Sequence, residues 1–508
     1  MNCETREEVD PLGEKLSEGG EKGPGNHKSI ASIVFYYRRY KDALSTHPFI
    51  HRTWLSKSWT EGVNPMESQF TQTDVVVVGG GLAGLSAASY LARGGVAVTL
   101  FEKARNLGGR ATTQNREGYH FNRGIHALYT GGATEEVLQE LGVPYSGHSP
   151  KEVYILRQGK LYSAPYDPLT LLRSRLFSAA GKLELARVFA SLPRLNPREL
   201  ARVSVQEWLE RNIRRPRVRQ FMAAFARTYV YSSALDLVSA EVFIAKMQLT
   251  LNNPVIYIDG GWQMLVEGLR RAAEQAGARI VSSTRVEAVE HQNGRVQGVH
   301  LRDGRSVCAS AVIIATAPKD AVILVDSGTY PPLRQLVKAL IPAQVACLDV
   351  ALSRLPNSRY TIVQDMERAR FMSTQSLYSR VAPTGGALIY TFKQLDPRQP
   401  SDPGEDERDL EDLLDTAQPG WRDMLVKRQY LPRIDAIGML PTASGGGYAG
   451  RPGPQVPGIA NLYLAGDWVG EGFLSDPAMA SARQAAQLVV KVVLSRSLEE
   501  KLPAGVTL

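Results

Sequence analysis

Cysteine is scarce in this chain, with Cys3, Cys308 and Cys347 as its only three among 508 residues. The three lie far apart and form no Cys-x-x-Cys pair, which excludes a local redox pair or a zinc knuckle and fits a reducing compartment. No run of about 18 apolar residues occurs, so we expect no membrane-spanning helix. We expect no bound metal, and the polar, acidic N-terminus argues against a secretory signal.

Charge is unevenly distributed along a chain whose formal net charge is +8. Residues 1–27 carry seven acidic and three basic residues, whereas residues 151–227 carry sixteen Lys/Arg and six Asp/Glu. A basic region suits nucleic acid, anionic lipid or an acidic substrate, and it is equally common as a solvated helix face. Because no nucleic-acid motif or interleaved stacking aromatics accompany it, we expect no nucleic-acid partner.

A β-α-β unit is predicted to begin at Asp74. The four valines 75–78 read as a strand buried on both faces of a parallel sheet, and the glycine-rich hexapeptide 79–84 follows at once. Small and apolar residues then predict a helix that stops at Gly94. Residues 96–102 predict a second strand, which ends in the carboxylate of Glu102.

The hexapeptide matches the Gly-x-Gly-x-x-Gly pattern of dinucleotide-binding folds. Gly79 permits the tight turn, Gly81 lets the backbone approach a pyrophosphate, and Gly84 lets helix and strand pack closely. The helix N-terminus at Leu82 and Ala83 offers N–H groups and a partial positive charge to phosphates. The acid that ends the second strand stands where it can accept hydrogen bonds from a ribose.

A second hexapeptide, residues 445–450, matches the same pattern and differs at one position. The residues before it form no apolar strand, and the eight after it contain three prolines and cannot form a helix. We therefore predict one dinucleotide site, and interpret residues 445–450 as a glycine-rich turn. The open alternative is a loop that touches the bound ligand.

Several further motifs resemble the flavin amine oxidase superfamily, and most of all its phytoene dehydrogenase-like branch, which includes carotenoid desaturases. The resemblance covers roughly residues 74–495 and implies that the dinucleotide is FAD. The motifs occur in the family's order: "EKARNLGGRATT" (102–113), "FNRGIHALYTGG" (121–132), "YIDGGWQML" (257–265) and "LYLAGDWVGEGFLSDPAMASARQAA" (462–486).

The resemblance also assigns contacts to FAD. Arg110 would neutralise the pyrophosphate, Asp467 would bind its ribityl–pyrophosphate part, and Val286 would contact the adenine through its backbone. Asp476, followed by proline, is expected to cap the last helix, whose first N–H groups would face the flavin. The FAD contacts implied beyond the first glycine loop and Glu102 are Lys103, Gly109, Arg110, Val286, Gly466, Asp467, Ala478 and Met479.

The implied fold is α/β: a Rossmann-like FAD domain of the glutathione-reductase type interleaved with an α+β substrate domain. We expect the FAD domain at 71–130, 254–325 and 440–495, and the substrate domain at 131–253 and 326–439. We expect residues 1–70 to be a disordered extension and 496–508 a tail. Residues 30–62 read either as a small surface helix or as sequence upstream of a true start at Met66.

The implied activity is FAD-dependent oxidation or desaturation of an apolar, isoprenoid-like or lipid-like substrate by hydride transfer. Alternatives are an amine oxidase, a protoporphyrinogen oxidase, or an FAD-containing protein without turnover. His126 is a candidate proton acceptor, although packing explains it as well, and Trp468 either walls the cavity or packs. We expect a cytoplasmic location, with peripheral binding of residues 167–195 to an anionic membrane as an open alternative.

Two features depart from the family. Bacterial carotenoid desaturases usually carry a different glycine-rich C-terminal motif without Gly-Asp-Trp, which this chain has at 466–468. The aromatic pair and the flavin-side lysine of amine oxidases have no recognisable counterpart in the sequence. Neither a carotenoid nor an amine is therefore fixed as the substrate.

Overall fold

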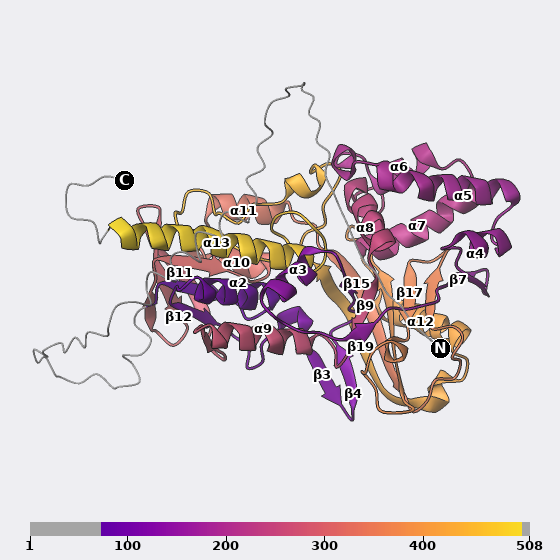
Figure 1. The fold of residues 1–508 in the computed structure, drawn as a ribbon, viewed down its shortest axis with the longest axis horizontal. Helices are drawn as coiled ribbons and strands as arrows, with labels where there is room; N and C mark the ends of the chain where they lie inside the picture. The colour runs from indigo at the N-terminus through magenta and orange to yellow at the C-terminus, as the bar shows by residue number, and fades with distance from the viewer. Residues whose placement is uncertain (1–72, 500–508) are drawn as a thin grey trace, which may run out of the picture. The chain divides into compact units, whose positions relative to one another are not determined.

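A five-stranded parallel sheet forms the first half of the fold in the computed structural model, which describes residues 73–499 (Figure 1). Its strand order is β10-β2-β1-β14-β20, and every neighbouring pair is parallel. The strands come from distant parts of the sequence: β1 (Val75–Val78), β2 (Val98–Phe101), β10 (Arg279–Val281), β14 (Ala311–Ile314) and β20 (Leu462–Leu464).

The two faces of this sheet bury alternate residues of the same strand. Val75 and Val77 pack with the helices, and Val76 and Val78 pack with a second, smaller sheet. The helices, which lie side by side in Figure 1, are α2 (Leu82–Arg93), α9 (Gln263–Gln275) and α13 (Asp476–Glu499). The other face carries β11 (Val286–Gln292), β12 (Arg295–Leu301), β13 (Ser306–Cys308), α10 (Pro318–Ile323) and α11 (Pro331–Lys338).

A seven-stranded sheet, ordered β19-β15-β18-β17-β16-β7-β8, forms the second half. Its strands are β7 (Tyr154–Arg157), β8 (Lys160–Ser163), β15 (Ala343–Leu352), β16 (Ile362–Asp365), β17 (Arg370–Ser373), β18 (Ala387–Gln394) and β19 (Leu425–Ile437). One face packs on helices that Figure 1 shows grouped together: α4 (Pro168–Arg173), α5 (Ala179–Ser191), α6 (Val205–Asn212), α7 (Pro216–Val230) and α8 (Ala240–Asn252). The other face is covered by α12 (Pro403–Ala417).

Short elements connect the two halves: β3 (Thr113–Arg116), β4 (Tyr119–Asn122), β5 (Leu128–Tyr129), α3 (Ala133–Glu140), β6 (Gly147–His148) and β9 (Val255–Ile258). The predicted extension 1–70 lies outside the described residues. Helix α13 continues to Glu499, into the segment expected as a tail. Between residues 73 and 499, no helix has the length and hydropathy needed to cross a bilayer.

Candidate functional site

The first glycine loop connects β1 to α2, and two of its glycines are required by the fold itself. Gly79 has φ +110°, and a Cβ there would lie 2.6 Å from the carbonyl oxygen of Ala315. A Cβ on Gly84 would lie 1.8 Å from the carbonyl oxygen of Gly79. Any side chain at either position would therefore displace backbone.

Gly81 is different, because nothing in the protein fills the position of its missing side chain. It has φ −81°, and an added Cβ would approach only the carbonyl oxygen of Gly108, at 3.9 Å. A Cβ on Gly109 would likewise meet only the Cα of Gly81, at 3.8 Å. This open position adjoins the N-terminus of α2, where the N–H groups of Leu82 and Ala83 have no acceptor within the helix. The residues present fit the pyrophosphate of a dinucleotide.

Glu102 holds this loop in place from the end of β2. Its carboxylate accepts hydrogen bonds from the backbone N–H of Gly80 at 2.6 Å and of Ala104 at 2.8 Å. Its backbone carbonyl accepts from Thr284 N–H at 2.9 Å, which brings the start of β11, with Val286, beside the end of β2. The proposed ribose and adenine contacts are thus adjacent.

Lys103, next to Glu102, points to a different partner. Its ammonium lies 2.6 Å from the carboxylate of Asp320 on α10, and the two side chains are 55% and 43% exposed. The cation is therefore already paired across the edge of the sheet. A contact of Lys103 with FAD stays a prediction.

Arg110 and Asp467 form a bidentate ion pair although they are 357 positions apart. The two N–O distances are 2.7 and 2.5 Å, and the same carboxylate accepts from Gly438 N–H at 2.6 Å. Burial raises the pKa of the Asp467 carboxyl, but the guanidinium of Arg110 and these hydrogen bonds outweigh burial and hold it below its usual value. Arg110, which we expect to face the pyrophosphate, is thus already paired with Asp467, the residue that we expect to bind the ribityl part.

The segment that leads into α13 is anchored at Gly466. Its N–H donates to the hydroxyl of Ser481, on α13, at 3.0 Å. Its φ of +156° lies at the edge of the left-handed region, and a Cβ there would be 2.8 Å from Nε1 of Trp468. Trp468 is fully buried, and its Nε1–H donates to the carbonyl of Thr316, so its role is packing rather than lining a cavity.

The N-terminus of α13 differs from our expectation in two ways. Asp476 is the first residue of the helix, and its carboxylate accepts from the N–H of Thr134, at 3.0 Å, on the neighbouring helix α3. It therefore serves the N-terminus of α3, where the partial positive charge attracts an anion, instead of its own helix. The N–H of Met479 donates to Ser475 within the first turn, so Ala478 is the better-placed contact for a ligand.

His126 lies in a crowded position between the two halves. Its Nδ1 is 3.0 Å from the carbonyl oxygen of Gly124, and its ring contacts that of Trp262. Burial lowers the pKa of His126, so the ring is neutral near pH 7. The backbone of Arg110 also hydrogen-bonds the ring, so His126 has a backbone partner besides Gly124. These contacts fit a packing role, and proton acceptance by His126 stays a prediction.

Five tyrosines that the sequence did not single out are close to one another, on β5, on β9, at the end of α7 and in the loop before α4. Tyr166 keeps 50% of its surface exposed, and burial and the nearby Tyr229 and Tyr257 raise the pKa of its hydroxyl well above the usual value. Burial also raises the pKa of the other members, in the case of Tyr257 to about 12: Tyr129, Tyr229, Tyr231 and Tyr257.

The second hexapeptide forms no dinucleotide loop. Residues Gly447–Gly450 make a single short 3-10 turn, as a glycine-rich turn would. The N–H of Tyr448 donates to the carboxylate of Glu241 on α8 at 2.8 Å, and a Cβ on Gly447 would collide with that carboxylate. The turn is thus packed against α8.

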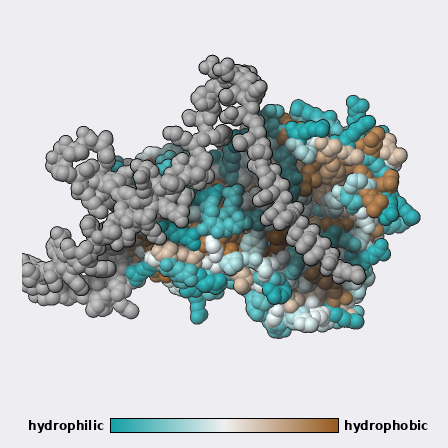
Figure 2. Space-filling view, viewed as in Figure 1, coloured by the Kyte–Doolittle hydropathy of each residue, from teal (hydrophilic) through white to brown (hydrophobic). Residues whose placement is uncertain are grey.

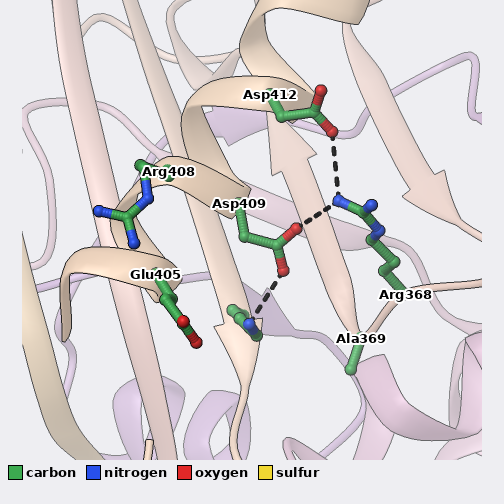
Figure 3. A pocket seen from close by; sticks show the side chains of 7 residues that line it. Arg368, Ala369, Glu405, Arg408, Asp409 and Asp412 are labelled. Atoms are coloured by element: carbon green, nitrogen blue, oxygen red, sulfur yellow. Dashed lines mark hydrogen bonds and ion pairs between the residues drawn. The ribbon is translucent and has the colours of Figure 1, made fainter. Parts of the chain in front are cut away.

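A surface pocket of about 680 Å³ lies on α12 and the adjoining strand ends (Figure 3). In Figure 3 the guanidinium of Arg368 points toward the carboxylates of Asp409 and Asp412. The ammonium of Lys393 lies 2.9 Å from the carboxylate of Asp409. These charges neutralise one another and attach α12 to the seven-stranded sheet. We interpret the pocket as structural, since it shares no element with the glycine loop.

Comparison with known proteins identifies the family and the fold. The sequence model described as "Flavin containing amine oxidoreductase" matches residues 82–490. The 4,4'-diaponeurosporene oxygenase of Staphylococcus aureus is 23% identical over 275 residues, which cover 47% of this chain and 54% of that protein. The chain thus spans about half the length of the curated relatives it matches.

Solved structures show the same fold. An oxidoreductase from Methanosarcina mazei has a TM-score of 0.66 at 18% identity, covering 82% of this chain and 100% of that one. Cyclohexylamine oxidase from Brevibacterium oxydans has a TM-score of 0.62 at 18% identity, covering 83% and 99%.

These findings confirm the predicted fold class, the flavin cofactor and the enzyme class, and they remove the alternative of a protein without turnover. The site residues named above stay proposals, although the structure brings the glycine loop, Glu102, Arg110 and Asp467 onto one side of the five-stranded sheet's carboxyl edge. The chain belongs to the flavin-containing amine oxidoreductase family and is an FAD-dependent oxidoreductase.

Proposed function

We propose that this enzyme oxidises or desaturates an apolar, isoprenoid-like or lipid-like substrate. The observation that carries the proposal is the tyrosine cluster itself, whose members lie close together and whose hydroxyl pKa values burial raises: Tyr129, Tyr166, Tyr229, Tyr231 and Tyr257. Aromatic side chains of this kind predominate in sites that bind apolar molecules. The Staphylococcus aureus relative, whose name refers to diaponeurosporene, supports the same class of substrate.

Different residues of this chain would bind the cofactor and accept the proton. Gly81, Gly109 and the N-terminus of α2 would hold the pyrophosphate, and Glu102 would hold the ribose. Bound FAD supplies the hydride acceptor for a substrate C–H bond. His126, whose pKa is lowered by burial, is the candidate to take the proton lost from the neighbouring carbon.

Anaerobic mixing of the FAD-loaded enzyme with candidate substrates tests this function. We expect an isoprenoid polyene to bleach the flavin absorption, because oxidation of the substrate reduces the cofactor. Primary amines and a porphyrinogen, the substrates of the alternative enzymes, serve as the comparison. If an amine or a porphyrinogen bleaches the flavin and no isoprenoid does, the proposed function is wrong and the enzyme is an amine oxidase or a protoporphyrinogen oxidase.

We further propose that α4 and α5 dock the enzyme on an anionic membrane, where a lipid-like substrate resides. Helix α4 has no buried residue, and Leu169, Leu172 and Leu183 are 53%, 71% and 53% exposed. Figure 2 shows brown, apolar atoms at the end of the molecule where Figure 1 places α4 and α5. Exposed Arg173 and Arg175 flank these leucines, as expected for a surface that enters the headgroup region.

Co-sedimentation with vesicles checks the docking surface. We expect binding to phosphatidylserine-containing vesicles, weakened by salt, and little binding to pure phosphatidylcholine. Each exposed cation near an anionic leaflet contributes about 1 kcal/mol, so Arg173→Ala with Arg175→Ala should reduce partitioning by roughly 30-fold. Arg211→Ala with Arg214→Ala, on α6 and the loop after it, is the charge-matched control and should retain binding. Equal, negligible binding to both vesicle types would contradict docking.

A further inference from the structure

A lysine is buried beside the tyrosine cluster. The side chain of Lys246, on α8, is 4% exposed, and its ammonium lies 3.5 Å from the carboxylate of Asp476. The ammonium also lies 4.2 Å from the centre of the Tyr129 ring. Within residues 73–499 no other hydrogen-bond acceptor reaches it. An ammonium has three N–H donors, so one distant carboxylate and one ring face leave at least one of them without an acceptor.

Asp476 is only a partial partner for this ammonium. Its other carboxylate oxygen accepts two hydrogen bonds from Thr134, one from the backbone N–H at 3.0 Å and one from the hydroxyl at 2.8 Å. The carboxylate is therefore fixed on the N-terminus of α3, and the ion pair with Lys246 stays long. Burial lowers the pKa of Lys246, and the charge of Asp476 opposes that shift without cancelling it.

The neighbouring tyrosines present hydroxyls at the same place. The hydroxyls of Tyr129 and Tyr231 lie close enough to influence each other's pKa, and burial raises both pKa values. Tyr231 ends α7 in the left-handed conformation, with φ +53°, and its ring stacks on Phe392. A bulky residue in this conformation is strained, and such strain is typical of functional positions.

We propose that Lys246 and the Tyr129–Tyr231 pair form a polar subsite that binds an oxygen atom at one end of the substrate. The inference rests on the proposed function and narrows it, because the preferred substrate is then an oxygenated isoprenoid-like or lipid-like molecule. A pure hydrocarbon would leave buried N–H donors without an acceptor, and sites built for hydrogen bonding discriminate against such analogues.

Equilibrium binding to the FAD-loaded full chain tests the subsite without turnover. The probes are farnesol and farnesene, isoprenoids of the same carbon number; farnesene lacks the terminal hydroxyl and has one more double bond. Dissociation constants come from the change in the flavin absorption bands on anaerobic titration, checked by calorimetry. We expect farnesol to bind at least tenfold more tightly than farnesene to the unchanged protein.

Two substitutions locate that preference. Lys246→Met keeps the length of the side chain and removes the ammonium, and we expect the two isoprenoids then to bind equally. Tyr129→Phe keeps the packing of the ring, removes one hydroxyl, and should reduce the preference even if Lys246→Met fails to fold. Lys160→Met, at an exposed position of β8, is the matched control and should leave the preference unchanged.

The outcomes separate this inference from the proposed function. Equal binding of farnesol and farnesene to the unchanged protein overturns the oxygen subsite and leaves the proposed function in place. A preference for farnesol that persists in both variants also overturns it. Failure of both isoprenoids to bind, with an amine or a porphyrinogen bleaching the flavin, overturns the proposed function and this inference with it.

Discussion

Gly81→Val is expected to abolish FAD retention while the chain stays folded. The protein leaves the side-chain position of Gly81 open, with the nearest atom 3.9 Å from an added Cβ, and its φ of −81° suits any residue. A valine side chain would instead occupy the space proposed for the pyrophosphate. Purified variant should have less than about one tenth of the flavin absorbance of the unchanged protein, with an unaltered circular dichroism spectrum.

Two other glycine-to-valine substitutions serve as controls for Gly81→Val. Gly453→Val, in an exposed loop where no atom lies within 4 Å of an added Cβ, should retain one FAD per chain. Gly84→Val should lose the fold together with FAD, because its Cβ would overlap the carbonyl of Gly79. If Gly81→Val kept stoichiometric FAD, the pyrophosphate would have to bind elsewhere.

Arg110→Met is expected to destabilise the FAD-loaded protein by about 2–3 kcal/mol at neutral pH, because it leaves a buried carboxylate without its cation. The side chain of Asp467 is 5% exposed, whereas that of Arg110 is 45% exposed. The expected loss of stability is therefore smaller than for a fully buried ion pair. Thermal unfolding followed by circular dichroism measures it. Arg211→Met, which breaks an exposed pair with Glu207, is the control and should cost at most about 1 kcal/mol.

The pH dependence identifies the carboxylate responsible. In the unchanged protein the pKa of Asp467 lies below its usual value, so its ionised form stabilises the fold above the unfolded pKa, and this contribution is lost as the pH falls through the folded pKa. Without Arg110, burial raises the pKa of Asp467. Protonation at lower pH then removes the unpaired buried charge and restores part of the variant's lost stability. The difference in melting temperature between variant and unchanged protein should therefore shrink from pH 7 to pH 4. A difference that is constant over this range would place the cost on another group.

Much of the flavin half could be predicted because its signals are local. The four valines 75–78, the glycines after them and Glu102 follow one another within a single β-α-β unit, and each has the conformation or contact that its neighbours require. The strand order was not predictable from these patterns, since β14 and β20 pair with partners far away in the sequence. The order and register of such strands depend on packing between distant segments, and no short stretch of sequence contains that information.

The remainder of the site depends on tertiary partners. Asp476 stands at a helix start with proline after it, which locally favours a cap, but the competing N-terminus of α3 lies within reach only in the folded chain. Lys246 occurs in the apolar helix α8, where one cation looks like an ordinary snorkelling residue. Tyr129 and Tyr257 lie inside motifs that we had quoted, yet their spacing carried no sign that their hydroxyls would converge.

The origin of the five parallel strands has a consequence for how the chain folds. Strand β1 begins at Val75, whereas β20, which completes the sheet beside β14, begins at Leu462. A ribosome must therefore synthesise nearly the whole chain before β20 can pair with β14. This pairing joins residues that are far apart in the sequence, which slows folding. Until then β14 is an unpaired, apolar edge that can recruit other strands. Chains truncated before residue 462 should aggregate rather than accumulate as a flavin-binding fragment.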